Sequence, residues 1–339
     1  MYDVGIIGAG INGSSVAYEF LKQNKKVILF DQDTIASGGS GAAGAFISPK
    51  FASSGELKDL LDEAFTYSMH FYEKNFPHLF TKAPLIHTEQ DNSQSFTIES
   101  GMVNAEAMCK ALCEGVEFIQ LQVESLVYED EIWIIDNTYK CKHIVLATGA
   151  YKQIIKEPYI QIRGIWGHRI DIKTKTQNKN ILHQFVSISP SKDGVISIGA
   201  THDVHYHPQT ARQAYDIQTG RKELLEKASR MIDLEDVKVI KDYTGLRSGS
   251  VDYMPLLGSL VSSKETLEKG LRLDTKKIDY EVFNYYPNLH MINGNGGYGF
   301  VLAPYLASIL CAHILYDKDI NKRLSPARFF HRWAKKNRK

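Results

Sequence analysis

A glycine-rich loop between an apolar strand and a helix is the feature that most restricts how this chain can fold. Residues 3–7 predict a short buried strand, and apolar side chains recur at helical spacing from Gly13 onward. Gly8, Gly10 and Gly13 form a GxGxxG pattern between the two. Gly8 permits a tight turn, Gly10 lets a pyrophosphate approach the backbone, and Gly13 lets the helix pack on the strand. In this context the pattern predicts a dinucleotide-binding β-α-β unit rather than an unrelated glycine-rich turn.

An acid at the end of the next strand supports the same interpretation. Residues 27–30 predict a second strand that ends on Asp31, 23 residues after Gly8. A carboxylate at this spacing can hydrogen-bond a ribose diol, and it disfavours a 2′-phosphate. Ile11 and Asn12 lie in the first turn of the predicted helix, where backbone N–H groups and the helix dipole face phosphates. We therefore place both residues, with the three glycines and Asp31, in a cofactor site.

A run of small residues after Asp31 favours FAD over a nicotinamide cofactor. Residues 37–44 are almost all small, so the backbone there can lie against a large flat group. A nicotinamide-binding domain would normally continue into another helix and strand at this point. The alternative interpretation is a flexible loop. The residues of this run that we assign to FAD are Ser37, Gly38, Ser40, Gly41, Ala42, Ala43 and Gly44.

Two further segments are assigned to the same cofactor. Ala147, Thr148 and Gly149 follow a buried strand and resemble the segment that passes under FAD in flavoproteins with two dinucleotide folds. Val123, in a segment that alternates in the manner of strands, is also assigned to the cofactor site.

A second glycine loop, residues 294–299, precedes a long apolar helix. Its backbone N–H groups and the positive end of the helix would stabilise negative charge on a reduced flavin. The alternative is a helix start that only packs against the first strand. The residues assigned from this loop are Gly294, Gly296, Gly297, Tyr298 and Gly299.

Substrate chemistry depends on Arg247, which stands among glycines in the segment 245–249. A lone arginine at a strand end is suited to bidentate binding of a carboxylate. An arginine that pairs with a structural acid would show the same spacing. Tyr253 and Tyr298 are further candidates to line the catalytic pocket. We assign no protein base, because hydride transfer from a neutral amine does not require one.

The order of predicted elements indicates two structural regions. Short β-runs between residues 160 and 245 alternate with turns and one helix, which favours an antiparallel sheet. The predicted fold is α/β (α+β), a Rossmann-like GxGxxG FAD-binding domain with an inserted antiparallel-sheet substrate domain. We assign residues 1–80, 100–155 and 245–339 to the discontinuous FAD-binding domain. Residues 81–99 and 156–244 form the predicted substrate domain.

The overall charge excludes a strong electrostatic field over the whole molecule. The net charge is +1, which gives no indication of DNA as a partner. Charge is uneven locally, since residues 328–339 hold six lysines and arginines and no acid. We interpret this end as a solvated helix end rather than an RNA contact.

The remaining composition argues against metals, disulfides and a membrane span. His202, His205 and His207 lack a further ligand of suitable geometry, so no metal site is predicted. The apolar stretch 300–316 is short for a membrane span and contains Pro304, which favours a buried helix and no integral membrane segment. A strand that begins at residue 3 leaves no room for a signal peptide, so we expect a cytoplasmic protein. The four cysteines, which we interpret as buried free thiols with no covalent bond to FAD, are Cys109, Cys113, Cys141 and Cys311.

Taken together, these motifs resemble the D-amino-acid-oxidase (DAO) superfamily of FAD enzymes, which includes glycine oxidases, sarcosine oxidases and D-amino-acid dehydrogenases. The Gly-Leu-Arg at 245–247, followed by Asp252, Pro255 and Gly258, is the most specific part of the resemblance. The resemblance implies that Arg247 binds a substrate carboxylate. The matching segments are Gly8–Asp31, Ser37–Pro49, Val145–Gly149, Arg163–Gly164, Ile198–Thr201, Gly245–Gly258 and Gly294–Pro304.

Several segments are similar to one branch of the superfamily, the oxidase modules of bifunctional bacterial tRNA-modifying proteins. These segments are residues 101–104, 198–201, 299–304 and 324–329. Such modules oxidise 5-carboxymethylaminomethyl-uridine, an N-substituted glycine on the tRNA wobble base, and leave an aminomethyl group and glyoxylate. Two departures are present: the chain has no methyltransferase segment, and no arginine lies at Gly297-Tyr298, where the superfamily's glycine oxidases and tRNA modules carry one.

Three functional hypotheses follow from the sequence. The first is an FAD-dependent oxidoreductase that oxidises the C–N bond of an amino acid or N-substituted glycine, by hydride transfer to flavin N5 and then imine hydrolysis. The second is a tRNA wobble 5-carboxymethylaminomethyl-uridine oxidase, and the third is a non-catalytic flavoprotein. The partner is accordingly a small amino acid or amine, or tRNA. Nothing in the sequence selects among oxygen, a quinone and a partner flavoprotein as the electron acceptor.

Overall fold

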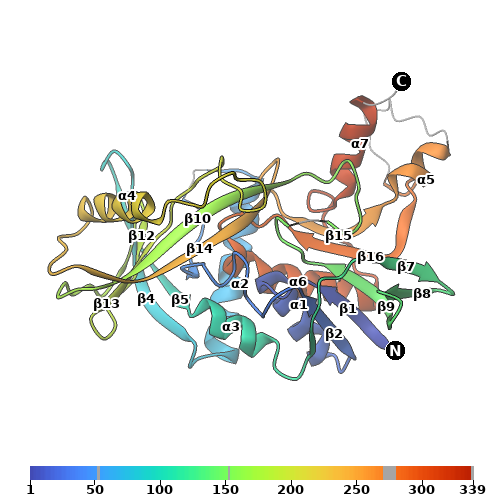
Figure 1. Ribbon diagram of the computed structural model, residues 1–339, viewed down its shortest axis with the longest axis horizontal. Helices are drawn as coiled ribbons and strands as arrows, with labels where there is room; N and C mark the ends of the chain where they lie inside the picture. The colour runs from blue at the N-terminus through green and yellow to red at the C-terminus, as the bar shows by residue number, and fades with distance from the viewer. Residues whose placement is uncertain (52–53, 152, 270–279, 337–339) are drawn as a thin grey trace.

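The computed structural model describes residues 1–51, 54–151, 153–269 and 280–336, and contains two eight-stranded sheets (Figure 1). The first sheet has the order β15-β16-β9-β1-β2-β6, with β8 paired to β9 and β7 to β8. Its strands from β16 to β6 are parallel, and β15 is antiparallel to β16. The strand bounds are β1 (Tyr2–Ile7), β2 (Val27–Asp31), β6 (Glu117–Gln120), β7 (Leu126–Glu129), β8 (Ile132–Ile135), β9 (Tyr139–Leu146), β15 (Leu256–Val261) and β16 (Tyr285–Asn293).

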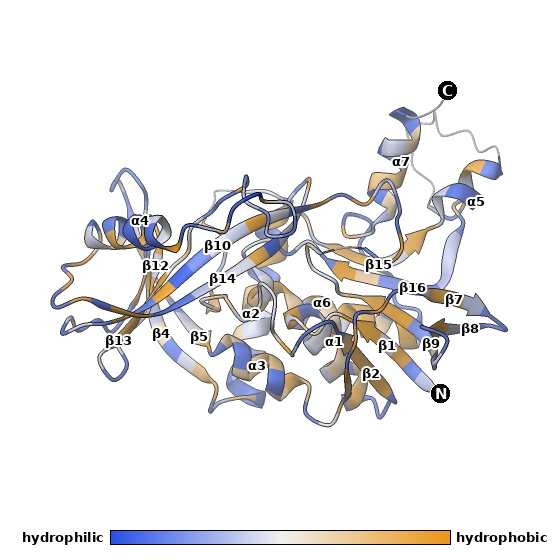
Figure 2. Ribbon diagram, in the orientation of Figure 1, coloured by the Kyte–Doolittle hydropathy of each residue, from blue (hydrophilic) through white to orange (hydrophobic). Residues whose placement is uncertain are grey.

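The first sheet is buried on both faces, as its apolar strands require. Along β2, Val27 and Leu29 point into one hydrophobic cluster, whereas Ile28 and Phe30 point into another, because successive side chains alternate across a strand. Figure 2 shows these strands and α6 as the hydrophobic centre of the molecule. One face is covered by helices α1 (Ile11–Lys22), α2 (Glu56–Asn75), α3 (Ala105–Leu112) and α6 (Gly299–Tyr316). The other is covered by the hairpin β7–β8 and helix α7 (Ala327–Lys336).

Helix α6 lies in the centre of the helical layer although it contains Pro304. Proline has no N–H for the carbonyl four residues earlier, which is that of Phe300. The Tyr72 hydroxyl donates to this carbonyl at 2.9 Å, and Ser68 Oγ donates to the next one, Val301 O, at 2.7 Å. By length and composition α6 could also cross a membrane, with half of its 18-residue window buried. Its packing against α1 and α2 identifies it as the core helix of this fold.

The second sheet has the order β14-β10-β13-β12-β11-β4-β5-β3. All its pairs among the described residues are antiparallel except β11 with β4, which is parallel. Helix α4 (Ile217–Ser229) covers one face, where isoleucines of β10 and β13 pack on Leu224 and Ala228. The strand bounds are β3 (Phe46–Ile47), β4 (Phe80–Thr88), β5 (Ser95–Val103), β10 (Ile162–Lys173), β11 (Ile181–His183), β12 (Ser187–Ile188), β13 (Val195–Gly199) and β14 (Lys238–Ser250).

The predicted fold class is confirmed, and the strands add detail at the predicted domain boundaries. Strand β5 extends across the predicted boundary at residues 99/100, and β14 extends across that at 244/245. Arg247 therefore belongs to the second sheet, although the prediction placed it in the FAD-binding segment. The short helix α5 (Ser263–Glu268) follows β15, at the same end of the molecule as α7 (Figure 1).

Candidate active site

A cavity of about 1700 Å³ lies between the two sheets. Pockets for ordinary small molecules measure roughly 300–1,000 Å³, so this one has room for a dinucleotide together with a substrate. The first sheet contributes the loops after β1, β2, β9 and β16, and the second contributes β10, β13 and β14. Every residue assigned to the site from the sequence lines this cavity except Gly13 and Gly41.

The first glycine loop is shaped by close backbone contacts. Gly8 has a φ of +106°, and a Cβ there would overlap the carbonyl oxygen of Ala147 in the loop after β9. A Cβ on Gly13 would overlap the Gly8 carbonyl oxygen, so Gly13 supports the turn from behind. Ser40 Oγ accepts the Ile11 N–H at 2.9 Å, which holds the small-residue run against the start of α1. Because these glycines have no side chains, three segments that are distant in sequence can come into contact.

Asp31 is held at the edge of the cavity in a fixed orientation. Its Oδ2 accepts the Ala9 N–H at 2.7 Å, and its Oδ1 accepts the Asp33 N–H at 3.0 Å. Ser37 Oγ lies 3.5 Å from the same Oδ1. A carboxylate in this position at the end of β2 is suited to accept hydrogen bonds from a ribose.

Three glycines of the other two loops face open space. A Cβ built on Gly149, Gly296 or Gly297 would meet no atom within 4 Å. The loops are tied together, since Asn293 Nδ2 donates to Gly149 O at 2.9 Å and the Gly296 N–H donates to Ser248 O at 2.8 Å. Exposed backbone over a wide cavity fits a large planar group such as an isoalloxazine ring.

The second glycine loop also directs a helix end toward the cavity. Tyr298 is the N-cap of α6, and its ring packs against the first hydrophobic cluster, where burial raises the pKa of its hydroxyl. The first N–H groups of a helix have no partner within the helix, and the helix dipole is positive there. Asn12 supports this arrangement, because its Nδ2 donates to Ile292 O and its Oδ1 accepts from Asn295 Nδ2 at 2.7 Å.

Arg247 is a largely buried cation that no described carboxylate neutralises. Its Nη1 donates to the Thr201 carbonyl oxygen at 3.0 Å, and burial lowers the pKa of the guanidinium. None of the ion pairs among the described residues involves it. The guanidinium lies against Gly167, where a Cβ would come within 2.6 Å of Nη2. A cation in such surroundings is stabilised by an anionic partner, which the cavity that it lines can admit.

A buried hydrogen-bond network holds Thr201, the residue to whose carbonyl oxygen Arg247 donates. Thr201 is 3% exposed, and its Oγ1 accepts the His168 N–H at 2.9 Å. His168 Nε2 lies 2.9 Å from Asp242 Oδ1, and Arg221 forms a bidentate pair with the same carboxylate. The hydrogen bond from Arg221 is the largest cause that holds the pKa of Asp242 below its usual range. The orientation of Arg247 therefore depends on a chain of contacts from helix α4 through β14 and β10.

Sequence reasoning missed several residues that line the substrate side of the cavity. Ser48, His183, Ser187 and Ala200 line it, and His202, assigned only to surface or pocket, does so as well. Burial lowers the pKa of His183 to about 4. These residues lie in or just after different strands of the second sheet. The sequence signals for them are two matching segments, Ser37–Pro49 for Ser48 and Ile198–Thr201 for Ala200. None of the four cysteines is among the lining residues; all are buried free thiols, as predicted.

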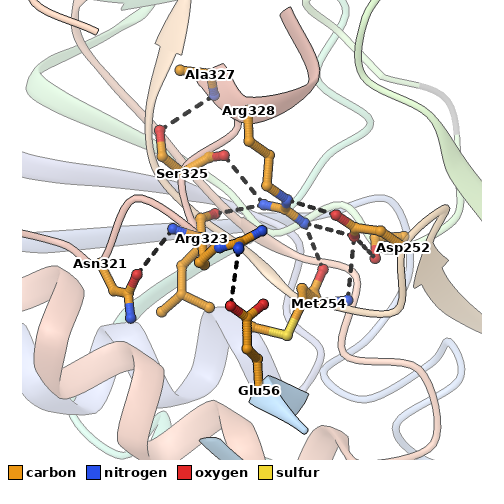
Figure 3. A network of polar contacts seen from close by, with 10 residues as sticks. Glu56, Asp252, Met254, Asn321, Arg323, Ser325, Ala327 and Arg328 are labelled. Atoms are coloured by element: carbon orange, nitrogen blue, oxygen red, sulfur yellow. Dashed lines mark hydrogen bonds and ion pairs between the residues drawn. The ribbon is translucent and has the colours of Figure 1, made fainter. Parts of the chain in front are cut away.

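Asp252, five residues after Arg247 in the sequence, has a structural role (Figure 3). Arg328 of α7 binds both its oxygens, at 2.9 and 3.0 Å, and also donates to Met254 O at 2.7 Å. Figure 3 shows a second pair nearby, Arg323 with Glu56, at 3.0 Å. Tyr253, between the two anchored residues, lines the cavity and is 70% exposed.

Comparison with known proteins agrees with this arrangement. The family model described as "FAD dependent oxidoreductase" (DAO) matches residues 3–96 and 82–313. The bifunctional protein MnmC of tRNA 5-methylaminomethyl-2-thiouridine biosynthesis from Legionella pneumophila (strain Corby) is 21% identical over 96% of this chain. The chain spans 57% of that relative's length. Glycine oxidase from Bacillus licheniformis is 24% identical over 76% of this chain and 84% of its own.

Solved structures share the fold. Glycine oxidase from Geobacillus kaustophilus superposes with a TM-score of 0.75 at 17% identity, covering 96% of this chain and 98% of its own. L-proline dehydrogenase from P. horikoshii has a TM-score of 0.74 at 14% identity, with 97% of each chain covered.

Proposed function

Because the chain belongs to the DAO family of FAD-dependent oxidoreductases, we propose that it oxidises the C–N bond of an amino acid or N-substituted glycine. The observation that carries the proposal is Arg247, a cation with no described carboxylate partner on the wall of the cavity. A substrate carboxylate is the anion that this position would bind, in a bidentate manner that suits a guanidinium.

The residues present fit a flavin dinucleotide, which we propose is held without a covalent bond. Gly8 and Gly10 would leave room for the pyrophosphate, and Asp31 would accept from the ribose. Gly149 and Gly297 would leave backbone open to the ring. When bound, FAD supplies the acceptor for the hydride of the substrate C–H bond.

The chain's own side chains orient the substrate rather than transfer its proton. Arg247 would fix the carboxylate, and Thr201 would fix Arg247 through its carbonyl oxygen. The start of α6 would stabilise negative charge that develops at its end of the cavity. We assign no protein base, because an amine bound in its neutral form can lose hydride without one.

The test is anaerobic bleaching of the purified flavoprotein with a panel of glycine, sarcosine, D-amino acids and N-substituted glycines. We expect at least one N-substituted glycine or amino acid to bleach the flavin and to yield the corresponding oxo acid. If no amine in the panel and no modified tRNA reduces the flavin, the proposed function is wrong and a non-catalytic flavoprotein is supported.

A tRNA-borne glycine adduct is the second candidate substrate. The relatives that are named for tRNA 5-methylaminomethyl-2-thiouridine biosynthesis match between 96% and 99% of this chain. The large cavity would also admit a substituted nucleoside. Glyoxylate released from tRNA that carries 5-carboxymethylaminomethyl-uridine, but not from free amino acids, would select this candidate. Failure of the same tRNA to bleach the flavin would exclude this tRNA as the substrate.

A further inference from the structure

The C-terminal helix carries a stripe of cations that begins at the mouth of the cavity. Arg328, Arg332 and Lys335 are spaced by four and three residues, so they share one face of α7. Phe330 and Ala334 are buried on the opposite face, and the Arg328 guanidinium lies over the ring of buried Phe329. Arg332 and Lys335 are exposed, and no acid occurs from residue 328 to the end of the chain. The sequence alone indicates only a solvated helix end here.

The position of Arg328 connects this stripe to the active site. Arg328 binds Asp252 (Figure 3). Because Asp252 lines the cavity, the cationic face of α7 starts next to the cavity wall. The Asp252 charge is compensated by this pair, and the other two cations of the stripe take no part in an ion pair among the described residues.

Two more exposed cations lie on the cavity wall, which also carries the exposed acids Asp33, Glu56 and Glu124. Lys156 and Arg163 both line the cavity, and neither has a described ion-pair partner. The segment that carries them packs directly beside α7, since the Tyr159 and Phe330 rings lie 5.5 Å apart in an edge contact. The acid in this segment, Glu157, is buried and accepts hydrogen bonds from Ser263 and Tyr286.

An exposed aromatic residue, Tyr253, lies between the two residues that Arg328 contacts. Tyr253 is 70% exposed and has a φ of +65°, an unusual conformation for a tyrosine that the Asp252–Arg328 and Met254–Arg328 contacts hold on either side. An exposed ring at the rim gains none of the stabilisation that burial of an aromatic side chain gives within the protein. Unpaired bases stack on such rings, while neighbouring lysines and arginines bind the phosphates.

We propose that this rim, formed by Tyr253, Lys156, Arg163, Arg332 and Lys335, is a docking surface for a single-stranded loop of RNA. The proposal rests on the proposed function in one respect: the docked loop presents its substituted base to the cavity beneath. The rim and the cavity would then have separate tasks, since Arg247 binds the carboxylate inside and the rim binds the polymer outside.

The test measures binding of unfractionated bacterial tRNA by fluorescence anisotropy between 50 and 200 mM KCl, with no turnover required. We expect Arg332→Glu/Lys335→Glu to weaken binding at least about tenfold and to reduce the salt slope by about one for each phosphate that is no longer bound. The matched control is Lys173→Glu/Lys179→Glu, which reverses two exposed cations of the second sheet and its following loop. This control is expected to change binding less than about twofold.

Tyr253 is tested with Tyr253→Ala and Tyr253→Phe. Loss of one stacked base weakens binding roughly fivefold or more, and the phenylalanine variant should retain the wild-type affinity because stacking does not need the hydroxyl. FAD content and thermal midpoint confirm that each variant is folded.

Equal weakening by both charge-reversal pairs would overturn the proposal, as would wild-type protein that fails to bind tRNA. Binding of anionic phosphatidylserine vesicles through Arg332 and Lys335, in place of tRNA, would show that the surface serves a membrane and also overturn it. Flavin reduction by a small amine is scored separately, so loss of the RNA surface and loss of the proposed oxidase activity give different results.

Discussion

The two walls of the cavity are built in different ways. The wall from the first sheet consists mainly of backbone, since glycines at 8, 13 and 149 let loops approach one another or leave peptide groups open. The wall from the second sheet presents side chains. Among them Arg247 is the strongest indication of the substrate, because its charge has no described carboxylate partner. A cofactor common to many enzymes can be held by backbone, whereas a particular substrate needs side chains that can vary.

The largest expected effect comes from adding atoms to the backbone wall. In Gly13→Val, the new side chain would overlap the Gly8 carbonyl oxygen, and the first turn of the fold would have to move. We expect destabilisation of about 3 kcal/mol and loss of FAD binding. Thermal unfolding and the flavin absorbance of the purified variant measure both. A Gly13→Val protein that keeps its FAD would show that this wall tolerates side chains after all.

Removing the charge of Arg247 should impair substrate binding at the wall from the second sheet and leave FAD binding at the first wall unchanged. Arg247→Met keeps an unbranched side chain in place of the arginine stem but has no guanidinium to bind a carboxylate. Loss of a desolvated charged pair costs about 2–5 kcal/mol, so kcat/KM should fall by roughly 30-fold or more, mainly through KM. The FAD content should equal that of the wild type. An unchanged KM for every carboxylate substrate would exclude Arg247 from the substrate site.

Thr201 tests whether the second wall depends on a positioning network. Thr201→Val removes the hydroxyl that accepts the His168 N–H, and Thr201→Ser retains it. Loss of this bond should shift the loop whose carbonyl holds Arg247, and we expect kcat/KM to fall about tenfold with the serine variant close to wild type. KM should carry most of the change. Equal damage by valine and serine would instead indicate an effect of altered packing around the side chain.

The smallest effect concerns pH and lies in the first sheet. Burial lowers the pKa of His290 to about 3, and its Nε2 has no described partner. In the unfolded chain His290 therefore binds a proton near pH 6.5, whereas in the folded protein it stays neutral at that pH. The free energy of unfolding consequently falls as the pH drops below that value. His290→Gln should remove about 1.4 kcal/mol per pH unit from this slope between pH 6 and 5. Urea unfolding at pH 7, 6 and 5 measures it, and an unaltered slope would assign the pH dependence to other groups.

Much of the first wall could be predicted because its signals are local. The strand before Gly8, the helix after Gly13 and the acid that ends β2 lie within about thirty residues, and each is restricted by the conformation of its own segment. The small-residue run before β3 and the loop before α6 follow the same logic. All of these predicted segments line the cavity, with Gly13 and Gly41 behind it.

The second wall could be predicted only in part. The antiparallel character of residues 160–245 was visible, but the register of β10 on β14 was not. That register places Ile165 opposite Arg247 and Gly167 beneath its guanidinium. Thr201, His168 and Asp242 lie on three different segments, so no spacing in the sequence indicates that they touch.

The sequence by itself determined the dinucleotide loop with the strands and helix around it, the antiparallel character of residues 160–245, and Arg247 as a candidate for binding a carboxylate. It left open whether that arginine had an acidic partner, because an ion pair between distant segments leaves no periodic trace. The tertiary structure decided this: the nearby acid, Asp252, pairs with Arg328 from the far end of the chain. Arg247 consequently faces the cavity with its charge available, and Tyr253 is held at the rim beside a stripe of cations that the sequence showed only as a basic tail.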